Sequence, residues 1–179
     1  MEVIRPGRPE GQRCSFVLGG ARSGKSRFAE ALVTAQAGPW TYVATAQAFD
    51  DEMRARIALH RERRAEGWIT VEAPLDLPEA ILASRRPVLV DCLTLWLTNV
   101  MLGEHDVAAA VVALEAALAR VAVPVVLVSN EVGLGIVPDN ALARRFRDAA
   151  GVLHQRIAAR AELVVMMVAG LPLYVKGSA

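Results

Sequence analysis

Short apolar runs alternate with longer amphipathic segments along most of the chain. Runs rich in Val, Leu and other apolar residues and bounded by polar or turn-forming residues are typical of buried strands. A weaker run at 69–72 could form a further short strand. The clear predicted strands are residues 14–19, 41–45, 87–92, 123–129 and 163–169.

The segments between these runs have helical spacing. In 24–37, for example, Phe28, Leu32 and Val33 fall on one side of a helix, and Gly38-Pro39 ends it. Strands that alternate with helices favour an α/β fold whose mostly parallel sheet has helices on both faces. The predicted helices are 24–37, 50–64, 77–84, 93–102, 106–120 and 140–161.

Composition narrows the class of protein. The chain has 179 residues, of which 54% are hydrophobic and 22% charged, and this excludes intrinsic disorder. A net charge of +1 provides no basic field for nucleic acid. Residues 1–13 are expected to form a flexible tail unlike a secretory signal, and 14–179 a single domain, because no Gly/Ser linker divides it. No apolar stretch reaches the roughly 18 residues of a membrane span, so a cytoplasmic protein is expected.

The two cysteines, Cys14 and Cys92, lie far apart in apolar runs. This pattern predicts buried, reduced thiols and not a disulfide or a metal site.

One motif carries specific chemistry. Residues 19–26 match G-x-x-x-x-G-K-[ST] between a predicted strand and a predicted helix, as in a phosphate-binding loop. The backbone N–H groups would surround the phosphates, Lys25 would reach the β and γ phosphates, and the Ser26 hydroxyl would bind Mg²⁺. The alternatives are a glycine-rich turn that only mimics the motif, and an Arg22 that faces solvent. The candidate nucleotide-binding residues are Gly19, Gly20, Ala21, Arg22, Ser23, Gly24, Lys25 and Ser26.

Asp91 is the candidate acidic partner of this loop, because it ends the predicted strand at 87–92. It would hold Mg²⁺ directly or through water. Alternatively, or in addition, it caps the helix that begins at residue 93.

His60 lies in a strongly charged predicted helix, on one face with Arg56, Arg63 and Arg64. Neighbouring guanidinium groups disfavour a protonated imidazole, and a neutral imidazole is a nucleophile. The arrangement suits attack on a nucleotide phosphorus, whereas the simpler interpretation is a solvated charged helix with an incidental histidine.

Two further features have open roles. Residues 130–138 follow a buried strand, where ligands bind in open α/β sheets, but they could be a plain connection. Their Asn130-Glu131 start is not the Asn-Lys-x-Asp guanine reader of GTPases. Trp68 could stack on a base or simply pack in the core.

Several strings in order along the chain resemble one family: GGARSGKS, YVAT, DDEMRARI followed by His60, VDCLTLWLTN and SNEVGLGIVP. The chain is similar to the bifunctional adenosylcobinamide kinase / adenosylcobinamide-phosphate guanylyltransferases of cobalamin biosynthesis. The resemblance implies a RecA-like P-loop fold, a homotrimer, GTP and ATP as substrates, and Mg²⁺. It implies phosphorylation of adenosylcobinamide, then GMP transfer from GTP through a guanylylated histidine, with release of pyrophosphate.

The resemblance also assigns residues. His60 matches the guanylylated position, and Lys25 and Asp91 match the phosphate site. The sequence departs from the family at residues 1–13, which precede its usual start, and at His154, where an Asn is expected. The family's positions near the guanylyl site are matched by Arg61, Glu62, Arg63, Arg64 and Glu72, and its loop after the second strand by Ala44, Thr45 and Ala46.

Two other functions remain compatible with the residues alone. One is a P-loop kinase of small metabolites without guanylyl transfer, which needs no nucleophilic histidine. The other is a nucleotide-binding switch that turns over no substrate.

Overall fold

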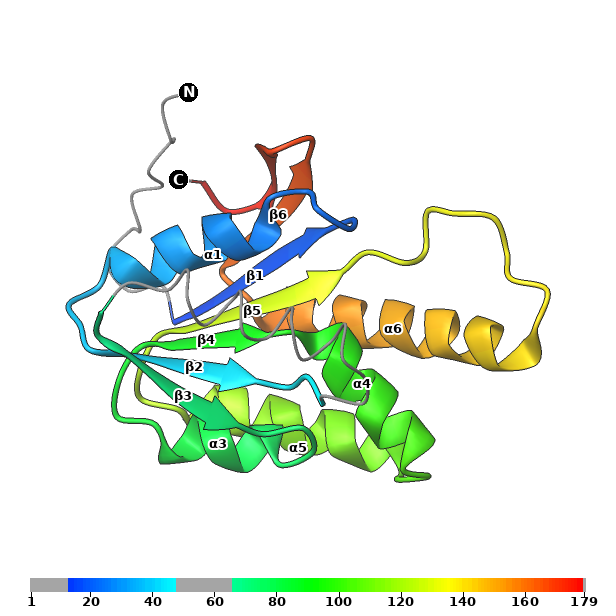
Figure 1. Ribbon diagram of the computed structural model, residues 1–179, viewed down its shortest axis with the longest axis horizontal. Helices are drawn as coiled ribbons and strands as arrows, with labels where there is room; N and C mark the ends of the chain where they lie inside the picture. Colours follow the sequence, from blue (N-terminus) through cyan, green and yellow to red (C-terminus); the bar gives the residue numbers. More distant parts are fainter. Residues whose placement is uncertain (1–12, 48–65, 179) are drawn as a thin grey trace.

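A seven-stranded sheet forms the centre of the protein (Figure 1). The structure is a computed structural model, and it describes residues 13–47 and 66–178. The strand order is β3-β2-β4-β5-β1-β6-β7, and every pairing is parallel except that of β6 with β7. The strands are β1 (Cys14–Gly19), β2 (Trp40–Ala44), β3 (Trp68–Glu72), β4 (Val88–Asp91), β5 (Val125–Asn130), β6 (Leu163–Val168) and β7 (Leu171–Lys176).

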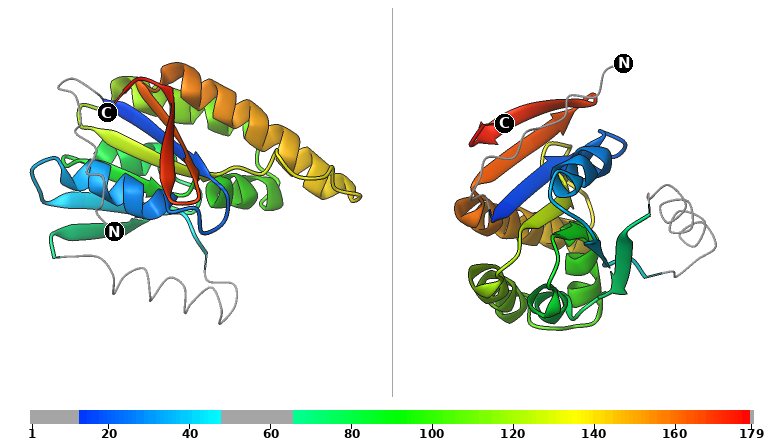
Figure 2. Two further views of the ribbon diagram at one scale, coloured as in Figure 1. Left: turned by 90° about the horizontal axis from the view of Figure 1, so that it is seen from above. Right: turned by 90° about the vertical axis from the view of Figure 1, so that its left-hand side faces the viewer.

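Helices cover both faces of this sheet, so the predicted α/β fold is confirmed (Figures 1 and 2). On one face lies α1 (Lys25–Thr34). On the other lie α3 (Leu77–Ala83), α4 (Leu93–Leu102), α5 (Val107–Arg120) and α6 (Ala141–Arg160). Among the described residues, no helix is both long and apolar enough to cross a membrane.

Alternate residues of each strand supply two separate cores. In β1, Phe16 packs with the core beneath α3 to α6, whereas Val17 packs against α1. In β5, Leu127 likewise packs beneath α3 to α6, and Val126 packs on the face that α1 covers. Because neighbouring side chains point to opposite faces, a strand buried on both sides is mostly apolar. β1 and β5 follow this pattern, with Ser15 and Ser129 as buried polar exceptions.

The predicted elements agree with the structure to within one to three residues. The expected helix starts at Asp106 and Asn140 are N-cap residues, whose side chains accept hydrogen bonds from Ala109 N (3.0 Å) and Ala143 N (2.7 Å). Cys14 and Cys92 are both buried and free, as expected. The predicted helix at 50–64 and, apart from Arg13, the predicted tail at 1–13 lie outside the described residues.

The sequence reading missed one strand, β7. It contains Pro172, which removes a backbone donor and argues against a central strand. The structure places this proline in a strand at the edge of the sheet, where such a residue is tolerated. Among the described strands β7 pairs only with β6. Leu171, Leu173 and Val175 alternate along β7 and share an exposed face, so the run lacks the buried pattern of the other strands.

Leu32 tests the α1 core. Its side chain is fully buried, so Leu32→Ala should lower the free energy of unfolding by about 2–5 kcal/mol in urea titrations. Leu102→Ala is the matched control, because Leu102 is 61% exposed and its loss should cost about 0.5 kcal/mol or less. Equal losses in the two variants would contradict this assignment of the core.

Candidate nucleotide-binding site

The predicted phosphate loop joins the end of β1 to the start of α1. Arg22 and Gly24 both adopt positive φ, 55° and 93°, and Gly24 is the N-cap of α1. A Cβ atom at Gly19 would lie 2.9 Å from the carbonyl oxygen of Met167, so the first glycine is required by a close backbone approach. A glycine-rich turn of this kind at the N-terminus of a helix is the arrangement that presents backbone N–H groups and the positive helix end to an anion.

Lys25 is buried and folds back over this loop. Its Nζ donates a hydrogen bond to the carbonyl oxygen of Gly20 at 2.9 Å. Burial lowers the pKa of the Lys25 ammonium from its usual value, and the negative charge of Asp91 opposes that shift. The cation is thus held where a phosphate would bind, with Asp91 as its nearby counter-charge.

Two other loops hold the phosphate loop in place. The backbone N–H of Glu131, just after β5, donates to Gly19 O at 3.0 Å. The backbone N–H of Gly170, in the turn between β6 and β7, donates to Ser23 O at 3.1 Å. The sequence analysis did not identify Gly170. The available signal is a glycine that follows a buried strand. Its φ of 83° is a backbone conformation that residues other than glycine rarely adopt.

Asp91 ends β4 at the same edge of the sheet. Its Oδ2 accepts a hydrogen bond from the hydroxyl of Tyr42 on the adjacent strand β2, at 3.1 Å. The N-cap of α4 is Cys92, and α4 has no side-chain cap bond, so the structure does not use Asp91 as a cap. Burial, and then the charge of Asp91, raise the pKa of the Cys92 thiol to about 11, so the thiol stays protonated at neutral pH.

Thr45 ties the end of β2 to the start of α4. Its buried hydroxyl donates to Cys92 O at 2.7 Å and accepts from Cys92 N at 2.8 Å. Its carbonyl oxygen accepts from the Asn99 side chain at 2.8 Å. The side chain of Thr45 is therefore committed to structure, while Ala44 and Ala46 on either side are partly exposed.

The predicted site residues that the structure describes lie at different distances from the phosphate loop along the carboxyl edge of the sheet. Asp91 is two strands from β1, about 10 Å along the edge, because neighbouring strands lie about 4.8 Å apart. Glu72 ends β3 and is paired in register with Ala44, four strands from β1 and thus about 19 Å from Gly19. The remaining predicted residues, His60, Arg61, Glu62, Arg63 and Arg64, lie outside the described residues.

Trp68 lies at the opposite end of β3 from Glu72, about 13 Å away along the strand. Its ring packs against Trp40 (centroids 5.5 Å apart) and Tyr42 (6.1 Å). These contacts favour the packing role for Trp68 over base stacking at the carboxyl edge.

A strand, a glycine-rich loop with a buried lysine, a helix and an acidic residue on a nearby strand together define a P-loop nucleotide-binding protein. The fold is shared with a solved protein from Pyrococcus horikoshii OT3, titled "Structural study of Project ID PH0250". That structure aligns with a TM-score of 0.51 at 10% identity, over 98% of this chain and 89% of the other.

Residues 15–175 match the family described as "Cobinamide kinase / cobinamide phosphate guanyltransferase", and the chain belongs to this family. It is 49% identical over 173 residues to the "Bifunctional adenosylcobalamin biosynthesis protein CobP" of Pseudomonas aeruginosa, across 90% of this chain and 96% of that protein. It is also 44% and 43% identical to the CobU proteins of the same description from Escherichia coli and Salmonella typhimurium, across 90% of this chain and 98% of each.

The charge pair of Lys25 and Asp91 yields a direct prediction. In Asp91→Asn the pKa of Lys25 should fall below its wild-type value, because burial still disfavours the ammonium and its main counter-charge is gone. The measurement is an NMR pH titration of isotope-labelled lysine, in which Lys176 is the only other signal. An unchanged or raised Lys25 pKa would contradict the predicted coupling.

Proposed function

We propose that this chain catalyses both reactions named by its family. In the first, the γ-phosphoryl group of a nucleoside triphosphate passes to the aminopropanol hydroxyl of adenosylcobinamide. In the second, the GMP moiety of GTP passes to the resulting phosphate, giving adenosylcobinamide-GDP and pyrophosphate. The observation that carries the proposal is a complete phosphate loop with a buried, charge-paired lysine, in a chain that matches the family over residues 15–175.

For the phosphoryl transfer, the 19–26 loop positions the triphosphate and Lys25 neutralises charge on it. Phosphoryl transfer demands mainly positioning and electrostatic stabilisation, which these groups supply. On binding a triphosphate, the Lys25 ammonium would exchange its bond to Gly20 O for bonds to phosphate oxygens. The 19–26 set, Arg22 included, is proposed as the triphosphate subsite.

Mg²⁺ is the metal that this reaction class uses, and the residues present fit it. The Ser26 hydroxyl, in the first turn of α1, and the Asp91 carboxylate, at the end of β4, are hard oxygen donors, the type that Mg²⁺ prefers. When bound, the ion would bridge and neutralise phosphate oxygens. Among the described residues no cluster of three or more His, Cys, Asp or Glu side chains could hold a metal. Phosphate oxygens and water would supply the remaining ligands, as is usual for Mg²⁺.

For the guanylyl transfer, His60 is proposed as the nucleophile. One imidazole nitrogen forms a bond to the α-phosphorus of GTP, and the bond from that phosphorus to the bridging oxygen breaks, releasing pyrophosphate. An oxygen of adenosylcobinamide phosphate then attacks the same phosphorus and frees the imidazole. Arg61, Arg63 and Arg64 are proposed to bind the phosphates. Glu62, Glu72 and the 44–46 segment are proposed to surround the nucleotide.

The remaining parts of the proposal are a homotrimer, a cytoplasmic location, ATP or GTP as the phosphoryl donor, and a single domain at 14–179. One sheet carries every described strand, which supports a single domain. The loop between β5 and α6 exposes Leu134 (82%), Ile136 (97%) and Val137 (64%), and such apolar exposure supports a contact between subunits.

Lys25→Met tests the phosphate loop. It removes the only side-chain ammonium at the loop, so kinase turnover should fall about 100-fold or more and nucleotide affinity should weaken. Lys176→Met is the matched control, because Lys176 bonds to the carbonyl oxygens of Ala158 and Ala159 at the end of α6 and should leave both values unchanged. Full activity in Lys25→Met would refute the site.

His60→Ala tests the covalent step. The variant should lose labelling by GTP that carries a radioactive α-phosphate, and lose guanylyl transfer, while its kinase turnover remains. His105→Ala, at an exposed histidine, should still become labelled. An acid-labile, base-stable adduct on His60→Ala would assign the nucleophile to another residue.

A further inference from the structure

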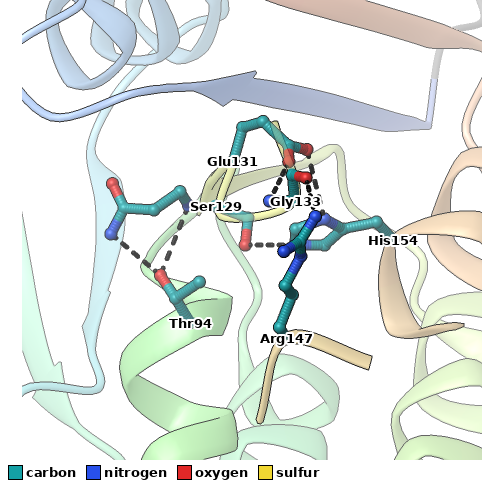
Figure 3. Close-up of polar contacts among 7 residues, drawn as sticks. Thr94, Ser129, Glu131, Gly133, Arg147 and His154 are labelled. Atoms are coloured by element: carbon teal, nitrogen blue, oxygen red, sulfur yellow. Dashed lines mark hydrogen bonds and ion pairs between the residues drawn. The ribbon is translucent and has the colours of Figure 1, made fainter. Parts of the chain in front are cut away.

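A buried histidine joins α6 to the loop that follows β5 (Figure 3). His154 is 8% exposed, and its Nε2 lies 2.8 Å from the hydroxyl of Ser129. Its Nδ1 lies 3.9 Å from Oε2 of Glu131. Phe16 of β1 packs against the ring, with centroids 5.6 Å apart.

The contacts of His154 with Ser129 and Glu131 resemble the catalytic triad of a hydrolase, but the burial of Ser129 excludes that role. Ser129 is fully buried in β5, so no substrate can reach its hydroxyl. Burial lowers the pKa of His154, and the charge of Glu131 only opposes this shift, so the ring is neutral at neutral pH. The 3.9 Å between Nδ1 and Oε2 is longer than a hydrogen bond, so this contact is electrostatic. A hydrogen on Nδ1 would face the carboxylate and leave Nε2 to accept from Ser129.

The carboxylate that His154 faces belongs to a turn held by several bonds. Oε1 of Glu131 accepts a hydrogen bond from the backbone N–H of Gly133, and Arg147 of α6 donates to Gly133 O. Figure 3 shows the Arg147 and His154 side chains reaching this turn together from α6. The N–H of Glu131 is the group that donates to Gly19 O, in the phosphate loop.

We propose that His154 is a positioning residue for the nucleotide site: it fixes Glu131, and Glu131 in turn fixes the first glycine of the phosphate loop. The inference rests on the proposed nucleotide binding at 19–26. It adds a residue more than a hundred positions away in sequence, on a different helix, to the set that determines nucleotide affinity. The path runs from His154 Nδ1, 3.9 Å from Glu131 Oε2, to the backbone N–H of Glu131, which donates to Gly19 O.

Two substitutions distinguish the contact of His154 with Glu131 from its contact with Ser129. In His154→Asn the side-chain amide N–H can take the place of Nδ1–H and keep the contact with Glu131. In His154→Gln the amide reaches the place of Nε2 and keeps only the contact with Ser129. Both lose part of a buried network, so both should be less stable than wild type.

The two variants should differ in their affinity for Mg·ATP and for Mg·GTP, each measured by calorimetry at neutral pH. His154→Asn should bind within about twofold of wild type, and His154→Gln about fivefold or more weakly. Ile157→Val, one turn further along α6 and fully buried, should lose stability without loss of affinity. This control separates a positioning role from a merely structural one.

A variant at the other end of the contact keeps the inference testable if the His154 variants do not fold. Glu131→Ala acts on a partly exposed loop residue and should weaken nucleotide binding by a similar factor. Equal nucleotide affinity in wild type, His154→Gln and Glu131→Ala would overturn the inference alone. A wild-type protein that binds no nucleotide, like Lys25→Met, would instead overturn the proposed function.

Discussion

Two backbone hydrogen bonds attach the phosphate loop to neighbouring connections of the sheet. Glu131 N donates to Gly19 O at one end of the loop, and Gly170 N donates to Ser23 O near the other. Each donor comes from a different connection at the carboxyl edge of the sheet, so the concavity depends on the parallel order that brings β5, β1 and β6 together. A glycine-rich loop alone would lose this shape to conformational entropy, and the neighbouring strands prevent that loss.

Groups at the carboxyl edge of the sheet also compensate the buried charge of Lys25. Lys25 is buried with its charge, which is unfavourable unless a counter-charge or a hydrogen bond compensates. Gly20 O and Asp91 provide that compensation in the absence of a phosphate, and Tyr42 orients the carboxylate. Under the proposed function, a triphosphate brings more negative charge than these protein groups do, and its oxygens would replace Gly20 O as partners of the ammonium.

Local patterns were enough to predict the sheet, its helices and the phosphate loop, because buried parallel strands and the 19–26 motif leave strong local signals. They failed for β7, whose side chains at Leu171 and Leu173 are exposed at an edge. They also failed for Gly170 and for the role of His154 beside Glu131, since these act through contacts between segments distant in sequence. The predicted role of His60 lies outside the described residues, so it stays a prediction.

The separation along the edge bears on how one domain could serve two reactions. Glu72 is four strands from β1, about 19 Å from Gly19, which is longer than the reach of one side chain. Asp91 lies midway, on β4, and it is bonded to β2 through Tyr42. The Glu72 side chain therefore cannot contact a triphosphate seated wholly in the phosphate loop. Contact between Glu72 and a nucleotide bound at the loop requires the nucleotide to extend along the edge past Asp91.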